Sequence, residues 1–225
     1  MKNNTTVADR LEDLVTLYHK DPIRSIAFAI NQGAADGVSA YDAGLTDILT
    51  ISNSPVDAKT AIYIEYICFY SHLLNRDIDN ELESEKSFEV SRITVGDAIT
   101  GEIIKLAVKK LHSYSKLLSE EYFENTLISR LNLTENIYSK TTRFAGLESL
   151  RSALGRNQDE MSTSFQFNKR VLSIFSDDKN IFEETKVIIN TSSCYQTFLT
   201  LIDLSEWVKG PIEQLGLKSY RQQQT

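Results

Sequence analysis

Glycine and proline are scarce in this chain, and their scarcity limits the folds that it can adopt. The 225 residues include nine Gly and three Pro, whereas average usage of the two would give about 27. These two residues supply most tight turns and most positions with positive φ. A sandwich or barrel built from many hairpins is therefore disfavoured, and long helices with few sharp turns are expected.

The clearest helix start is the segment Ser54-Pro55-Val56-Asp57. Serine is favoured at the N-cap, proline at the first helical position, and an acidic residue in the first turn, where it interacts with the helix dipole. The pattern predicts a helix over residues 56–78. Its apolar residues lie around most of the circumference, so we expect it to be the central helix of the fold.

A second long helix is expected over residues 181–208. Apolar residues repeat there every seven positions, which is typical of a buried helix face; they are Ile181, Ile188, Tyr195 and Ile202. Gly210-Pro211 is expected to end this helix. The patterns over residues 86–95 and 163–175 are compatible with a helix or a strand, and the sequence does not decide between the two.

The main irregular region is expected over residues 32–55. Gly33, Gly37 and Gly44 lie in it and are a third of all the glycines. Gly33 is expected to end a short helix that starts at Asp21-Pro22. The region would then be the loop most free to carry a function.

The whole pattern predicts a single all-α domain over residues 1–218, a bundle of about seven to nine helices. No internal repeat and no linker is evident. The last residues, 219–225, are polar, and we expect them to form a disordered tail.

The chain is acidic, with a net charge of −7 and a pI near 5.1. Because like charges repel, nucleic acid and anionic membranes are disfavoured as main partners. Residues 1–113 hold 11 Lys/Arg and 17 Asp/Glu, and residues 114–225 hold 13 and 14. This difference is either scatter or an acidic N-terminal face that meets a basic partner.

A local basic excess over residues 125–175 fits a mixed solvated surface, a thin RNA-binding patch, or a site for an acidic partner such as another copy.

We expect a cytoplasmic protein. Cys68 and Cys194 are its two cysteines and lie in apolar surroundings, which is typical of buried thiols in a reducing compartment. The first ten residues are polar and do not resemble a signal peptide. The longest uncharged stretch, residues 187–202, has 16 residues and is too short and too polar to span a membrane.

The common motifs of catalytic and metal sites are absent from the sequence. There is no Glu-x-x-His or His-Glu-x-x-His motif for iron or zinc, no Gly-x-x-x-x-Gly-Lys phosphate loop and no Gly-x-Ser-x-Gly nucleophile turn. With three histidines in the chain, a histidine-based metal site would need most of them. We therefore expect no metal and no cofactor, and the sequence favours a binding protein over an enzyme.

Three polar residues form one stripe along the predicted 56–78 helix. At 100° per residue, His72 and Arg76 each fall within about 20° of Glu65. Glu65 could orient His72 for acid/base chemistry while Arg76 holds an anion. Alternatively, the three form a solvent face or pair with a neighbouring helix. A second stripe lies roughly opposite and consists of Tyr63, Tyr66 and Tyr70; it is a candidate ligand-binding surface or, alternatively, part of the core or of an interface.

The leading hypothesis is a cytoplasmic helical interaction protein of a regulatory, adaptor or toxin-neutralising type. It would act by binding a protein partner or by forming a homodimer or larger homo-oligomer, since apolar faces at 104–118 and 181–202 suit self-association. The alternative is a small-molecule-binding protein or enzyme that uses the Glu65/His72/Arg76 stripe.

Overall fold

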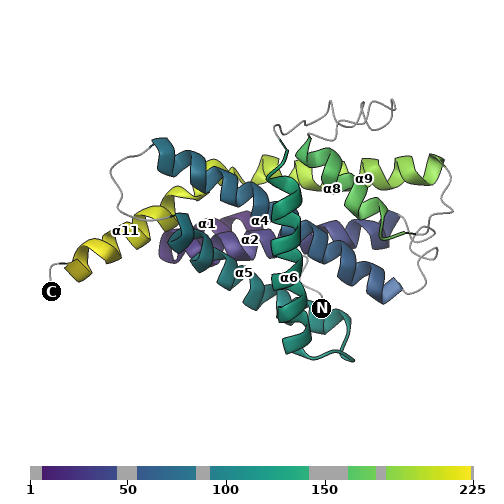
Figure 1. The fold of residues 1–225 in the computed structure, drawn as a ribbon, viewed down its shortest axis with the longest axis horizontal. Helices are drawn as coiled ribbons and strands as arrows, with labels where there is room; N and C mark the ends of the chain where they lie inside the picture. Colours follow the sequence, from purple (N-terminus) through teal and green to yellow (C-terminus); the bar gives the residue numbers. More distant parts are fainter. Residues whose placement is uncertain (1–6, 45–54, 85–91, 142–161, 176–180, 224–225) are drawn as a thin grey trace.

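The computed structural model describes residues 7–44, 55–84, 92–141, 162–175 and 181–223, and within these ranges it contains helices and no β-strand. This confirms the all-α fold, and the number of helices agrees with the predicted seven to nine. The elements are α1 (Val7–Lys20), α2 (Pro22–Gly44), α4 (Pro55–Ser84), α5 (Arg92–Tyr114), α6 (Glu120–Tyr138), α8 (Thr163–Leu172), α9 (Ile181–Leu201), α10 (Leu204–Trp207) and α11 (Lys209–Gln223) (Figure 1).

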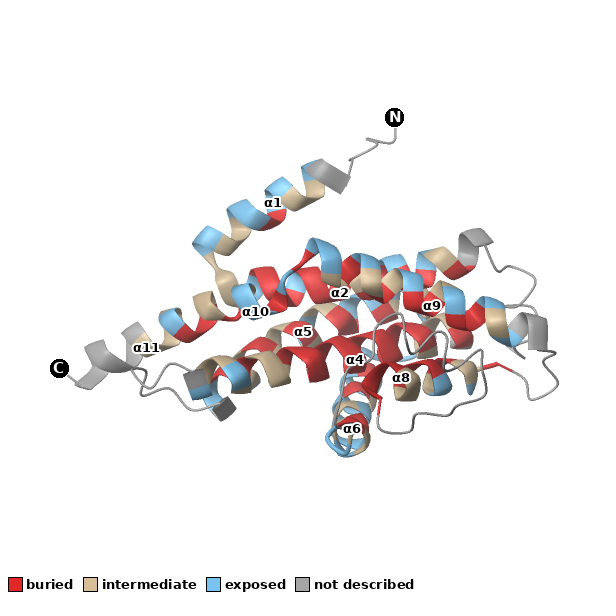
Figure 2. Ribbon diagram, turned by 90° about the horizontal axis from the view of Figure 1, so that it is seen from above, coloured by how far each residue is buried: buried red, intermediate tan, exposed pale blue. Residues whose placement is uncertain are grey.

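Helix α4 is the centre of the fold, as its apolar circumference predicts. It packs against α2, α5, α6, α8 and α10, and buried residues occupy most of its length in Figure 2. Ile62, Ile67 and Phe69 point in different directions from the helix axis, yet none of the three is exposed to solvent. A helix that is surrounded by others can therefore bury polar groups only where a neighbouring helix supplies a partner.

The prediction of an irregular region over 32–55 is wrong for residues 32–44, which belong to helix α2. The helix continues through Gly33 and ends at Gly44, and residues 45–54 lie outside the described ranges. Gly33 and Gly37 are four residues apart and therefore share one face of the helix. A Cβ atom at Gly33 would lie 2.5 Å from the ring of Phe198, and one at Gly37 would lie 2.6 Å from the ring of Tyr66. These glycines allow aromatic rings to pack against the α2 backbone.

Replacing Gly37 with Ala is therefore expected to destabilise the protein, although Ala is the better helix former. The propensity gain of about 1 kcal/mol is outweighed by overpacking against Tyr66, for a net loss of about 1–2 kcal/mol. Gly101 is a matched control in α5, because a Cβ there would meet nothing within 4 Å. Gly101→Ala should raise the free energy of unfolding by about 0.5–1 kcal/mol. Chemical denaturation of both variants checks the opposite signs, and an equal gain in both would contradict the packing role.

The C-terminal part is divided where one long helix over 181–208 is predicted. Helix α9 ends at Leu201, and the Asp203 side chain caps α10 by accepting hydrogen bonds from the backbone N–H groups of Ser205 and Glu206. Gly210 and Pro211 do not end a helix but lie in the first turn of α11, where a missing proline N–H costs no hydrogen bond. Helix α11 continues to Gln223, into the segment for which a tail is expected.

The two segments that the sequence leaves open between helix and strand are helical over residues 92–95 and 163–172. Residues 163–172 form α8, with the Ser162 hydroxyl accepting a hydrogen bond from the Phe165 N–H at the N-cap. Residues from Arg92 onward belong to α5, and residues 85–91 lie outside the described ranges. Two helices lie at the margin of the bundle: α1 extends away from the body in Figure 2, and α6 crosses the direction of the central helices in Figure 1.

Candidate functional site

The first residue of the predicted polar stripe, Glu65, is buried in an ion pair. Its side chain on α4 is 3% exposed. Arg170 of α8 donates to both carboxylate oxygens, from Nε to Oε2 at 2.6 Å and from Nη2 to Oε1 at 2.8 Å. Arg130 of α6 lies at 3.6 Å from Oε1. A bidentate guanidinium is the partner that best compensates a carboxylate removed from water, so this contact ties α8 to the central helix.

The second residue, His72, pairs with a different helix. Its Nδ1 lies 3.0 Å from Oε2 of Glu135 on α6, a hydrogen bond in which the ring N–H donates to the carboxylate. Its ring packs beside Tyr138, with the centroids 5.2 Å apart. The other ring nitrogen, Nε2, is buried and has no hydrogen-bond partner within the described ranges. The His72–Glu135 pair connects α6 to α4 about two helical turns further along α4 than Glu65.

The third residue, Arg76, is half-buried near the far end of α4. Its neighbour Asp77 is also half-buried, and burial raises the pKa of the Asp77 carboxyl to about 6, with Arg76 opposing and Asp203 adding to the rise. Arg76 therefore belongs to the electrostatic surroundings of Asp77, whose carboxyl is also influenced by Asp203 at the start of α10.

The side chains of Glu65 and His72 thus point away from α4 toward neighbouring helices. Glu65 and His72 share one face of α4, as predicted, but their hydrogen-bond partners come from α8 and α6. Sequence reasoning missed these partners. Arg130 and Arg170 stand in the sequence as part of the basic excess over 125–175, and nothing in their spacing indicates which helix they contact.

The tyrosine stripe lies in the core. Tyr63, Tyr66 and Tyr70 are fully buried, and burial raises the pKa of each hydroxyl above its usual value. Tyr63 donates a hydrogen bond to Asn31 Oδ1 at 2.6 Å, and Tyr66 donates to a backbone carbonyl of α9 at 3.3 Å. These hydroxyls connect α4 to α2 and α9, so their place in the structure is that of core residues.

A surface pocket lies between α1, α2 and α9, and we call it the α1–α9 groove. Its volume is about 150 Å³. Apolar side chains make up most of its wall, and they include Leu11, Leu14, Ala29, Phe198, Leu201 and Ile202. Polar groups gather at Asp36, which pairs with Arg10 at 3.4 Å and accepts a hydrogen bond from Gln32 at 2.9 Å. The groove is thus apolar with a charged edge.

The two cysteines differ in access to this groove. Cys194 is half-buried and lines the groove, whereas Cys68 is buried inside the bundle. Burial raises the pKa of both thiols, for Cys68 to about 12. Because the thiolate is the reactive form, Cys68 should be inert and Cys194 should react slowly.

The described residues contain no group of three or more His, Cys, Asp or Glu side chains able to hold a metal ion. In the same ranges, every helix is too short or too polar to cross a membrane.

Comparison with family models found no match, and comparisons with curated proteins and with solved structures found no significant similarity. The function is therefore inferred from the residues of this chain alone.

Proposed function

We propose that this protein acts by binding a protein partner, and that the α1–α9 groove receives an apolar side chain from an amphipathic helix of that partner. The observation that carries the proposal is the groove itself: an apolar pocket that opens on the surface between α1, α2 and α9. Grooves of this kind take up amphipathic helices through a few apolar anchors spaced one or two turns apart.

The size of the groove suits one such anchor. A cavity of about 150 Å³ lined by aliphatic and aromatic side chains can hold a group as large as benzene, and the groove has this volume. Leu201 at its edge is 43% exposed and Val15 on α1 is 46% exposed. Covering these side chains would add to the apolar area removed from water.

Charge indicates the chemistry of the partner. Helix α1 carries Asp9, Glu12 and Asp13 on its exposed side, against Arg10, which pairs with Asp36. The exposed side of α1 beside the apolar groove therefore carries negative charge, in keeping with the acidic N-terminal half of the chain. A partner helix with lysine or arginine on its polar face is favoured, because opposite charges steer association and exclude acidic competitors.

The contacts of the polar stripe favour this proposal over an enzyme built on Glu65, His72 and Arg76. A general base needs access to a substrate proton, whereas Glu65 and His72 are buried against α8 and α6. Their role in the proposal is to hold the bundle together behind the groove.

Helical peptides selected from two display libraries, one with a lysine-rich and one with a glutamate-rich polar face, test the proposal. We expect binders from the lysine library, and we expect Leu201→Asp to weaken them at least about tenfold, because a charge would enter the apolar groove. Ile189→Asp is the matched control, since Ile189 is on the same helix with 44% exposure but does not line the groove.

Two results would overturn the proposal: binders that come equally from both libraries, or lysine-rich binders that are insensitive to Leu201→Asp. A second copy of the chain is the alternative occupant of the groove, and light scattering at several protein concentrations tests for it by measuring the molecular mass. If the mass doubles with concentration in the wild type but not in Leu201→Asp, the groove binds a second copy of the chain and not a different protein.

A further inference from the structure

A second pocket lies between the central helix α4 and the crossing helix α6, and we call it the α4–α6 pocket. Its volume is about 270 Å³. Ile64 and Phe123 form a buried apolar floor, and Leu118 and Tyr122 line it as partly exposed side chains. Arg130 and Thr60 supply polar groups to the lining. This pocket shares no lining residue with the α1–α9 groove.

Arg130 brings an incompletely neutralised positive charge to the pocket. Two arginines face one carboxylate, and Arg170 occupies both oxygens of Glu65 at 2.6 and 2.8 Å, leaving Arg130 a single contact at 3.6 Å. The three side chains together carry a net charge of +1. With its side chain 44% exposed, Arg130 retains N–H donors for another acceptor.

The acidic residues of α6 do not neutralise this charge. Glu135, five residues further along the helix, is hydrogen-bonded to His72. Glu120, Glu121 and Glu124 are exposed and lie about 80°, 180° and 120° around the helix axis from Arg130. The pocket side of α6 therefore presents a cation.

A buried hydroxyl in the lining also lacks a partner. The Thr60 Oγ1 atom is shielded from solvent and makes no hydrogen bond within the described ranges. A buried polar atom without a partner is costly, and a bound polar group would satisfy it.

We propose that the α4–α6 pocket binds a small organic carboxylate with an apolar or aromatic body. The carboxylate accepts charge-assisted hydrogen bonds from Arg130, and the body covers the apolar floor next to Ile64 and Phe123. An inorganic phosphate is disfavoured, because it offers nothing to cover the floor and carries more charge than one guanidinium balances. The site is independent of the partner groove, so either can fail without the other.

Titration of the isotopically labelled protein with 3-phenylpropionate, followed by backbone amide shifts, tests the site. We expect saturable shifts confined to the ends of α4 and α6 that line the pocket. The neutral isostere 3-phenylpropionamide and inorganic phosphate should each bind at least about tenfold more weakly, because each lacks one half of the recognised chemistry. Absence of saturable shifts, or equal binding of acid and amide, would overturn the proposal.

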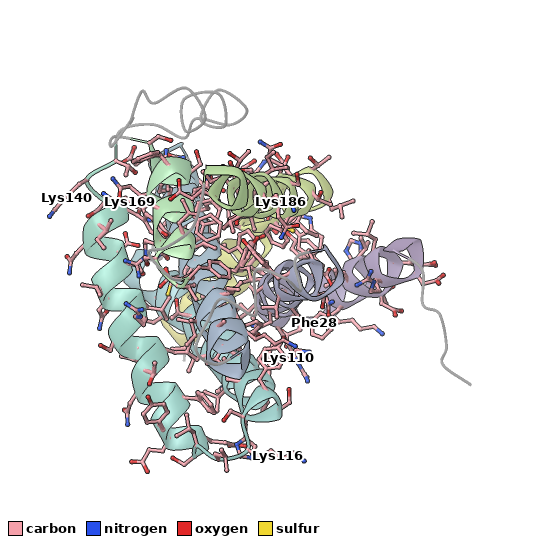
Figure 3. All side chains as sticks on the ribbon, turned by 90° about the vertical axis from the view of Figure 1, so that its right-hand side faces the viewer. Phe28, Lys110, Lys116, Lys140, Lys169 and Lys186 are labelled. Carbon is pink, nitrogen blue, oxygen red and sulfur yellow. The ribbon has the colours of Figure 1, made fainter. Side chains whose placement is uncertain are left out.

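Two variants locate the carboxylate and the body separately. Arg130→Gln should weaken 3-phenylpropionate at least about tenfold and leave the amide unaffected, while Glu65 keeps its two bonds to Arg170. Ala61→Leu should block both compounds by filling the pocket from α4, and it keeps the test valid if Arg130→Gln does not fold. Lys140→Gln is the control: this lysine is exposed just beyond the C-terminal end of α6, at the opposite end from Lys116, which lies in the turn before that helix (Figure 3). Unchanged affinity in Arg130→Gln would contradict the site.

Discussion

Replacing Arg170 with Met is expected to lower the free energy of unfolding by about 3–5 kcal/mol. The substitution leaves the Glu65 carboxylate buried, with its side chain 3% exposed, and removes both of its short hydrogen bonds. Arg130 compensates little, because its contact is 3.6 Å long and it is partly solvated. Chemical denaturation at neutral pH measures the loss, and circular dichroism verifies that the variant is folded.

Two further variants separate the lost ion pair from a general effect on α8. Lys169→Met changes the exposed neighbour of Arg170 and should alter stability by less than about 0.5 kcal/mol. The double variant Glu65→Met/Arg170→Met should recover most of the loss, since replacing a buried ion pair by apolar side chains is often neutral or stabilising. A loss below about 1 kcal/mol in Arg170→Met would show that Glu65 does not depend on α8.

Replacing Phe167 with Ala is expected to cost about 3–5 kcal/mol as well, because it opens a cavity in the aromatic core. Phe167 is fully buried on α8. Its ring stacks on Phe69 with the centroids 4.1 Å apart and an interplanar angle of 10°, and meets Tyr66 edge-on at 5.0 Å. These contacts join α8 to the middle of α4.

Phe28→Ala is the control for the loss of a phenylalanine ring. Phe28 is 46% exposed and lies at the surface in Figure 3, so we expect its removal to cost less than about 1 kcal/mol. Equal losses in Phe28→Ala and Phe167→Ala, measured by chemical denaturation, would contradict the assignment of Phe167 to the core. Phe167 and Arg170 are three residues apart on one face of a short helix, so their losses should not add in the double variant.

The central helix could be predicted from sequence because its signals are local. Ser54-Pro55 indicates the start, and apolar residues around the whole circumference indicate a helix enclosed by others. The stripe of Glu65 and His72 also follows from spacing alone. Their partners could not be predicted, because the way α6 and α8 cross α4 is fixed by packing between residues that are 63 and 105 positions apart.

The error at α2 has a physical reason. A glycine in a helical pattern weakens the helix by about 1 kcal/mol relative to alanine, and so it resembles an end signal. At Gly33 and Gly37 the space left by the missing side chain is filled by Phe198 and Tyr66, and these contacts are tertiary. The α1–α9 groove escaped prediction for the same reason, because its lining comes from three helices.

The break between α9 and α10 is indicated in the sequence by the N-cap residue Asp203. Asp203 lies two residues before Ser205 and three before Glu206. Its carboxylate accepts hydrogen bonds from their backbone N–H groups at 3.2 and 3.4 Å, and this is the pattern of a helix start. The seven-residue apolar repeat continues through Ile202 and conceals this start, since a buried position is apolar on either side of a break.

The rate at which a thiol reagent modifies Cys194 tests the proposed partner groove most directly. Cys194 lines the groove, and Cys68 is an internal reference whose burial raises its pKa to about 12. At alkaline pH, where more of the Cys194 thiol is ionised, we predict that a saturating lysine-rich helical peptide slows its modification at least about tenfold, and that Leu201→Asp abolishes this protection. Modification of Cys194 at an unchanged rate in the peptide-saturated wild type would contradict binding in the groove.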